Sequence, residues 1–154
     1  MRTHKIVVFI ARPAGGGQHE FLQLRRQGTG YLDGTWQTVR GSIELNETAA
    51  QAALRELREE TGARPAEFYR LGSVESFYDL ETDAIWHGAA FCALLDANAV
   101  ITLNDEHDAQ RWVSEEDVDR HFMWPSEKPL IAEIRREILQ NSLAKPHLLI
   151  KLES

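Results

Sequence analysis

The sequence has a single cysteine and no long apolar run, and both scarcities exclude classes of protein. Cys92, in the apolar stretch AAFCALL, is the one cysteine among 154 residues, so the chain can form neither an internal disulfide nor a zinc site made of cysteines. No stretch approaches the roughly 20 apolar residues that cross a bilayer as a helix. The beginning, MRTHKIVVFIARPAGGG, lacks the apolar core of a signal peptide. We therefore expect a cytoplasmic protein without a membrane partner.

Positive charge and recognisable side-chain nucleophiles are also scarce. Seventeen Lys and Arg stand against 24 Asp and Glu, which gives a net charge of −7 and argues against nucleic acid or an anionic membrane as partner. An anionic small molecule would need metal ions or local arginines to bind. The histidines show no His-Glu-x-x-His spacing, nothing resembles a Ser/His/Asp arrangement, and Gly15–Gly17 lack the Lys-Ser/Thr of a P-loop. Water is therefore the expected nucleophile of any hydrolysis.

The apolar pattern predicts one domain over residues 1–154, because this length suits a single core. Short β-branched or alternating runs predict strands and 3.6-residue periodicity predicts helices. Strands are expected over 5–11, 20–26, 36–41, 68–78, 84–96 and 109–113. One helix is expected over 48–61. A second, short helix is expected to open at Ser114, with Asp117 completing a capping box, and a third at Ser126, with Pro129 in its first turn. This order favours an α/β fold of the α+β type, with a mixed sheet and helices on both faces. The tail, 145–154, is either an edge strand or a loose end.

The clearest predicted helix is the one that follows Thr48. Thr48 is a good N-cap residue, and Gln51 three residues later completes a capping box. Gly62 is placed to end the helix in the left-handed conformation. Between these ends, an apolar stripe is expected to pack on the sheet. The stripe consists of Ala50, Ala53, Leu54 and Leu57.

The same helix carries three glutamates at i, i+3 and i+4, Glu56, Glu59 and Glu60, which therefore share a face. One interpretation is a solvated surface with Arg55 and Arg58 as ion-pair partners, which is what most charge runs are. The other is that the carboxylates converge on Mg²⁺, since hard divalent cations prefer oxygen ligands and relieve the repulsion. Composition alone favours the solvated surface.

The full spacing from residue 41 to residue 63, GSIELNETAAQAALRELREETGA, changes this balance because it resembles the Nudix box of the Nudix hydrolases. The matching positions are Gly41, Glu47, Arg55-Glu56-Leu57, Glu59-Glu60 and Gly62-Ala63. The resemblance implies an α/β/α sandwich with a mixed sheet, in which the box forms a loop, a helix and a loop that bind metals and pyrophosphate. Two departures, Arg40-Gly41-Ser42 for the common Pro-Gly-Gly and Asn46 for a turn glycine, are compatible with an intact box, since asparagine tolerates that turn.

The resemblance also implies roles within the box. Glu56, Glu59 and Glu60 would be associated with metal, and Glu59 would also be the catalytic base that orients or deprotonates water. The carbonyl of Gly41 would be a further metal ligand. Glu47 and Arg55 would brace the loop against the helix, which agrees with the chemistry of arginine, a group that cannot ligate a metal. Mg²⁺ is the expected metal and Mn²⁺ its usual substitute.

The flanking segments WQTVRGSI, NETAAQAALRE and DEHDAQRW are similar to the branch that contains dATP pyrophosphohydrolase and dihydroneopterin triphosphate pyrophosphatase. In that branch a glutamate just before a strand completes the metal site, and Glu106 is the matching residue here. Glu106 is otherwise an exposed loop acid, and His107 beside it is expected to cap or pack. Arg40, Arg25 and Arg26 either reach substrate phosphates or are solvated surface groups.

These observations lead to one hypothesis and two alternatives. The hypothesis is a Mg²⁺-dependent Nudix pyrophosphohydrolase that cleaves a nucleoside triphosphate, or its pterin analogue dihydroneopterin triphosphate, to a monophosphate and pyrophosphate. One alternative is the same chemistry on a dinucleoside polyphosphate, and the other is a catalytically silent nucleotide-binding module of the same fold. Trp36, Tyr78, Trp86 and Trp124 are either stacking partners for a base or core residues. The sequence leaves a homodimer open.

Overall fold

A computed structural model of the chain describes residues 4–28, 30 and 32–153. Two parts of the predictions lie outside that range. They are residues 1–3, which open the segment expected to lack the apolar core of a signal peptide, and residue 154, the last of the tail. The strands are β1 Lys5–Gly15, β2 Gln18–Arg26, β3 Trp36–Gln37, β4 Val39–Ser42, β5 Glu67–Asp79, β6 Ala84–Leu94, β7 His107–Ser114 and β8 Leu149–Ile150. The helices are α1 Ala49–Thr61, the 3₁₀ turn Glu115–Asp117, α2 Val118–His121, α3 Lys128–Glu133, the π-helical turn Ile134–Ile138 and α4 Lys145–Leu148.

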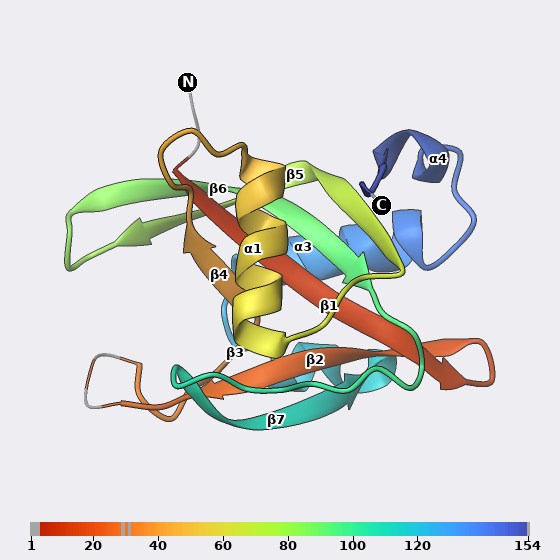
Figure 1. The fold of residues 1–154 in the computed structure, drawn as a ribbon, viewed down its shortest axis with the longest axis horizontal. Coiled ribbons are helices and arrows are strands. Elements are labelled where there is room, and N and C mark those ends of the chain that lie inside the picture. The colour runs from red at the N-terminus through yellow and green to blue at the C-terminus, as the bar shows by residue number, and fades with distance from the viewer. Residues whose placement is uncertain (1–3, 29, 31, 154) are drawn as a thin grey trace.

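The strands form one mixed sheet, as predicted. Its main order is β3-β2-β1-β6-β5-β8, with β4 paired to β1 and β7 paired to β2. The β1–β6 pair is parallel and the other pairs are antiparallel. Helix α1 covers one face of the sheet and α3 the other (Figure 1). The expected sandwich with helices on both faces is therefore confirmed.

Strand β1 lies in the middle of this sandwich because it is apolar on both sides. Ile6, Val8 and Ile10 point to the α1 side and join a core with Leu57. The alternate residues Val7, Phe9 and Ala11 belong to a second core on the α3 side. A strand without polar alternation is typical of a position that is covered on both faces.

Helix α1 begins and ends as its sequence predicts. The Thr48 hydroxyl accepts a hydrogen bond from the backbone N–H of Gln51 at 3.1 Å, and the Gln51 side chain accepts one from the backbone N–H of Thr48 at 2.9 Å. Gly62 ends the helix with φ 69°. The apolar stripe is rotated from the prediction: Ala52 is fully buried, whereas Ala50 and Leu54 are only partly buried. The rotation turns Glu60 inward, where it is buried as well.

Two predictions for the C-terminal third are wrong in detail. The Ser114 hydroxyl donates to the Asp117 carboxylate instead of accepting a backbone N–H, so no capping box forms and the segment is a 3₁₀ turn. The helix expected to open at Ser126 is α3, which begins at Lys128, and the Ser126 hydroxyl donates to the buried Glu75 at 3.0 Å instead of capping the helix. Pro129 does lie in its first turn.

The tail supplies α4 and then β8, which pairs with the edge of β5, so the edge-strand alternative is the correct one. The β5–β6 hairpin extends beyond the rest of the sheet (Figure 1). Val74, Tyr78 and Ile85 on these two strands are exposed. The homodimer that the sequence left open stays a prediction. None of the described helices has the length and apolar character needed to cross a membrane.

Candidate active site

The loop that enters α1 is held by an ion pair between Glu47 and Arg55. The Arg55 guanidinium donates to both Glu47 oxygens, from Nε at 2.8 Å and from Nη2 at 3.0 Å. It also donates to the backbone carbonyl of Ser42 at 2.9 Å. The hydrogen bonds from Arg55 lower the pKa of Glu47 to about 2. Asn46 takes the left-handed conformation, φ 64°, that the missing glycine would have supplied. The contact expected to brace the loop against the helix is therefore present.

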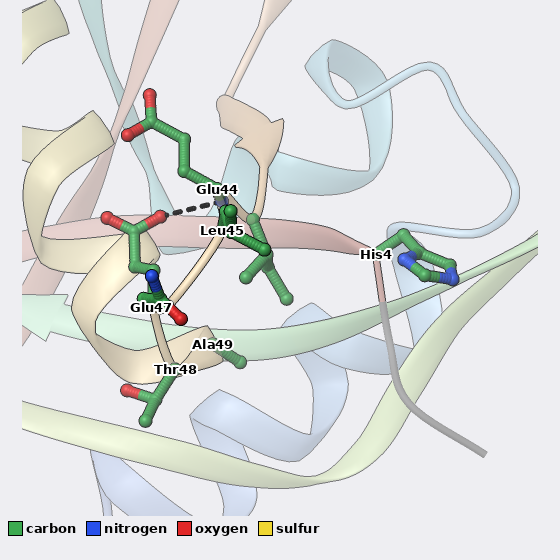
Figure 2. A pocket seen from close by; sticks show the side chains of 8 residues that line it. His4, Glu44, Leu45, Glu47, Thr48 and Ala49 are labelled. Atoms are coloured by element: carbon green, nitrogen blue, oxygen red, sulfur yellow. Dashed lines mark hydrogen bonds between the residues drawn. The ribbon is translucent and has the colours of Figure 1, made fainter.

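A pocket lies on the outer side of this loop and is separate from the carboxylates of α1. Figure 2 shows the side chains that line it, including His4, Leu45 and Thr48, and the hydrogen bond from the Glu44 backbone N–H to the Glu47 carboxylate. None of the three glutamates on the helix face lines it. The chemistry expected of the box therefore belongs to the carboxylate side of the helix and not to this pocket.

Gly41 lies against the side chain of Glu56, and this contact explains why the box needs glycine there. A Cβ built on Gly41 would lie 2.4 Å from both Cδ and Oε1 of Glu56. Any larger residue must displace the Glu56 carboxylate. β4, which carries Gly41, and α1, which carries Glu56, thus define the carboxylate position together.

We predict that Gly41→Ala lowers metal affinity by about 10–100-fold, because the added methyl group misorients a ligand. The stability of the fold should change by less than about 1 kcal/mol, since the group that must move is the end of a flexible side chain. Calorimetric titration with Mg²⁺ and denaturant unfolding measure the two effects. Gly72→Ala is the matched control, because a Cβ there meets only Glu133 oxygens at ordinary distances of 3.6 Å and more. Unchanged metal affinity in Gly41→Ala would contradict the role given to this contact.

Glu60 is the most unusual carboxyl of the cluster. Its side chain is 4% exposed, and its Oε2 has no hydrogen-bond partner within the described part of the chain. Burial raises its pKa to about 9, and a hydrogen bond with Glu56 and the charges of Glu56, Glu106 and Glu59 act in the same direction. Glu60 is therefore surrounded by other carboxyls in a poorly solvated position, where its charged form is stable only with a cation beside it.

Glu106 and His107 complete this cluster from the start of β7. Ligating atoms of Glu60, Glu106 and His107 all lie within 4.8 Å of one another. Glu106 is exposed, as a loop acid would be, but the β2–β7 pairing brings it to Glu60 and so favours the metal-site alternative. His107 is buried, and burial lowers its pKa, so the neutral ring is favoured. Apart from its place next to Glu106, no sequence pattern indicated that His107 belongs to this cluster.

Glu56 and Glu59 both contact Arg55 in this structure. Arg55 Nη1 lies 3.0 Å from Glu56 Oε1 and 3.4 Å from Glu59 Oε2. The expected ion pairing with Arg55 is therefore present, whereas no ion pair joins Arg58 to these glutamates among the residues described. The buried Glu60 oxygen, which has no hydrogen-bond partner among the described residues, and the carboxylates beside it form a donor set that fits a divalent cation. The residues available to hold it are Glu56, Glu59, Glu60 and Glu106, with the Gly41 carbonyl nearby.

Because Glu60 is buried, we predict that both the stability of the metal-free fold and its affinity for a divalent ion depend on pH. Its folded-state pKa, about 9, lies above its ordinary value of 4.5, so the metal-free fold loses stability as pH rises between these values. A divalent ion must displace the proton, and its affinity should therefore rise by up to about tenfold per pH unit in this range. Thermal unfolding with and without millimolar Mg²⁺ or Mn²⁺ measures this at about pH 6 and about pH 8.5. A metal-induced rise in Tm that is equal at both values would contradict the prediction.

The three arginines predicted to bind phosphate lie in different surroundings. Arg40 is ion-paired with Glu75 and Glu127 on the α3 side of the sheet. Arg25 donates from Nε to Asp108 at 2.7 Å. Arg26 is exposed and lies opposite His107 in the β2–β7 pairing, next to the carboxylate cluster. Phosphate binding stays a prediction for all three, and these contacts favour Arg26 over Arg40.

Of the aromatic candidates for base stacking, two already have cationic partners. The Arg111 guanidinium lies 4.2 Å from the centre of the Trp36 ring, and the Lys5 ammonium lies 5.0 Å from that of Trp86. Tyr78 donates from its hydroxyl to Asp83 at 2.8 Å. None of these contacts identifies a base site, so stacking stays a prediction.

Comparison with known proteins agrees with the fold and the box. The NUDIX domain model matches residues 2–134, so the chain belongs to the Nudix hydrolase family. The sequence is 27% identical over 128 residues to the nucleoside triphosphatase NudI of Klebsiella pneumoniae (strain 342), a match that covers 79% of this chain and 89% of NudI. It is 34% identical over 114 residues to an octanoyltransferase of Myxococcus xanthus, covering 73% of this chain. The chain spans 30% of the length of that octanoyltransferase.

Among solved structures, the fold is similar to that of the dihydroneopterin triphosphate pyrophosphohydrolase of E. coli. The TM-score is 0.68 at 23% identity, and the match covers 85% of this chain and 95% of that one. At this identity the likeness supports the fold alone.

Proposed function

We propose that this Nudix hydrolase is a divalent-metal-dependent pyrophosphohydrolase. Its substrate is a nucleoside triphosphate of the dATP type or dihydroneopterin triphosphate, and its products are a monophosphate and pyrophosphate. The observation that carries the proposal is the buried, unpartnered Glu60 oxygen, with Glu56, Glu59 and Glu106 close enough to raise its pKa. Such an arrangement is costly without cations, and a triphosphate is a ligand that shares cations with carboxylates. The likeness to NudI, a nucleoside triphosphatase, supports this substrate class.

The three glutamates of the helix face differ in side-chain exposure, and we assign their roles accordingly. Glu60, at 4% exposure, and Glu56, at 15%, are held by their surroundings and suit metal binding. Glu59, at 53%, faces solvent and suits contact with the attacking water. Bound Mg²⁺ or Mn²⁺ would neutralise phosphate oxygens and make water a better nucleophile. The ion pair between Glu47 and Arg55 holds the loop against the helix.

In the proposed reaction, Glu59 accepts a proton from water as the water oxygen bonds to phosphorus. The bridging bond between the α- and β-phosphates breaks, and its electron pair leaves with the departing phosphate group. Glu59 then returns the proton to solvent. For this step Glu59 must stay within hydrogen-bond distance of the attacking water. The contact between Arg55 and Glu59 favours this because it restricts the Glu59 side chain.

One screen tests the proposal against its alternatives. The purified chain is incubated with deoxynucleoside and nucleoside triphosphates, dihydroneopterin triphosphate and diadenosine polyphosphates, each with Mg²⁺ or Mn²⁺, and the products are separated. Pyrophosphate and a monophosphate from a triphosphate are expected. Faster turnover of a diadenosine polyphosphate would favour the dinucleoside alternative. Binding without turnover of any compound would favour the silent module.

A further inference from the structure

The His107 ring has a buried nitrogen, Nδ1, whose hydrogen-bonding capacity is unused among the described residues. His107 is the first residue of β7 and 5% exposed, and its Nδ1 has no hydrogen-bond partner among the residues that the structure describes. The nearest carboxylate oxygen, Glu60 Oε1, is 3.8 Å away, which is too long for a hydrogen bond. A buried polar atom without a partner costs free energy, so its retention calls for a reason.

The surroundings of this nitrogen suggest what it binds. Within residues 4–28, 30 and 32–153, the trio Glu60, Glu106 and His107 is the one group of three or more potential ligands gathered this closely. Two of the three side chains, Glu60 and His107, have buried atoms without partners. One ion at about 2.0–2.3 Å from each ligand can join two atoms up to roughly 4.4 Å apart, so 3.8 Å fits a shared cation.

We propose that His107 Nδ1 is a ligand of the divalent ion held by Glu60 and Glu106, and that this nitrogen makes the site prefer Mn²⁺ and Co²⁺ to Mg²⁺. The inference rests on the proposed function only in that both place a cation at Glu60. Mg²⁺ favours an all-oxygen shell, whereas imidazole nitrogen suits first-row transition metals. The carboxylates alone would not create this preference.

A second histidine in the structure provides a matched control. His19 Nδ1 is also buried without a partner and lies 3.7 Å from Glu115 Oε2. Glu115, however, already accepts hydrogen bonds from the His19 backbone N–H at 2.7 Å and from Arg135 Nε at 3.3 Å. His19 therefore faces a carboxylate that is already engaged, and it belongs to no three-ligand group among the described residues.

The test measures metal binding without substrate. Wild type, His107→Phe and His19→Phe are titrated with Mg²⁺, Mn²⁺ and Co²⁺ by calorimetry, and pulsed electron paramagnetic resonance of the Mn²⁺-loaded proteins detects coupling to a ligand nitrogen. In wild type and His19→Phe we expect the nitrogen coupling and tighter binding of Mn²⁺ and Co²⁺ than of Mg²⁺. In His107→Phe the coupling should vanish, and the affinities for Mn²⁺ and Co²⁺ should fall by about 10–100-fold, with little change for Mg²⁺.

The outcomes separate this inference from the proposed function. If wild type binds the ions but shows no nitrogen coupling, or if His107→Phe keeps the wild-type ratio of Mn²⁺ to Mg²⁺ affinity, the role of His107 is overturned and the carboxylate site stands. If wild type binds no ion at millimolar concentration even with a triphosphate, the proposed function fails first. Should His107→Phe not fold, His107→Gln replaces it, since an amide oxygen should abolish the nitrogen coupling and shift the preference toward Mg²⁺.

Discussion

Glu59→Gln is expected to lower the rate of triphosphate hydrolysis by about 10²–10⁴-fold, the usual contribution of a positioned general base. Glutamine keeps the shape of the side chain but cannot accept the proton of the attacking water. Of the three glutamates on the helix face, Glu59 is the most exposed, at 53%, so it can reach a water molecule that the more deeply placed Glu60 cannot. The loss should fall on kcat, with KM nearly unchanged, because Glu56, Glu60 and Glu106 still hold metal and substrate.

Pyrophosphate release under saturating Mg²⁺ and triphosphate measures this effect. Glu116→Gln is the matched control, because it removes the same charge from an exposed position in the 3₁₀ turn after β7. A Glu59→Gln protein that hydrolyses at the wild-type rate would move the base to another residue. A wild-type protein with no rate at all, yet with nucleotide binding, would identify a silent module.

Arg40→Met is expected to destabilise the fold by about 3–5 kcal/mol, the usual effect of removing one partner of a buried ion pair. Arg40 donates from Nε to Glu75 at 3.1 Å and from Nη2 to Glu127 at 3.1 Å. The Glu75 and Glu127 side chains are 4% and 1% exposed, so without Arg40 two carboxylates would be left in a poorly solvated site. Burial already raises the pKa of Glu127, against the opposing effect of Arg40.

Denaturant unfolding at several pH values measures this second effect. Without Arg40 the pKa of Glu127 should rise further above that of the unfolded chain, so the loss is greatest near neutral pH and shrinks as pH falls toward about 4.5. Arg25→Met is the control, because its partner Asp108 is on the surface and exposed pairs contribute about 1 kcal/mol or less. Unchanged stability with a raised KM would instead support the phosphate-binding role predicted for Arg40.

Glu60 and Arg40 differ in how much of their surroundings could be predicted from the sequence. The i, i+3, i+4 spacing predicted a shared face for Glu56, Glu59 and Glu60, and in the structure the charges of Glu56 and Glu59 act on Glu60. The Glu47–Arg55 contact that the family resemblance implied is present as well. No pattern indicated that Arg40 would be held between Glu75 and Glu127, because these residues belong to three separate elements. Their meeting depends on how β4, β5 and the start of α3 pack.

The sequence by itself determined what depends on neighbours along the chain: the caps of α1, the turn at Asn46, the apolar character of β1 and the set of carboxylates on one helix. Backbone geometry makes these relations nearly independent of the rest of the fold. The tertiary structure alone decided that α1 is rotated to bury Glu60, and that the pairing of β7 with β2 brings His107 within 3.8 Å of it. Contacts between distant segments follow from strand register and core packing, which local patterns do not encode.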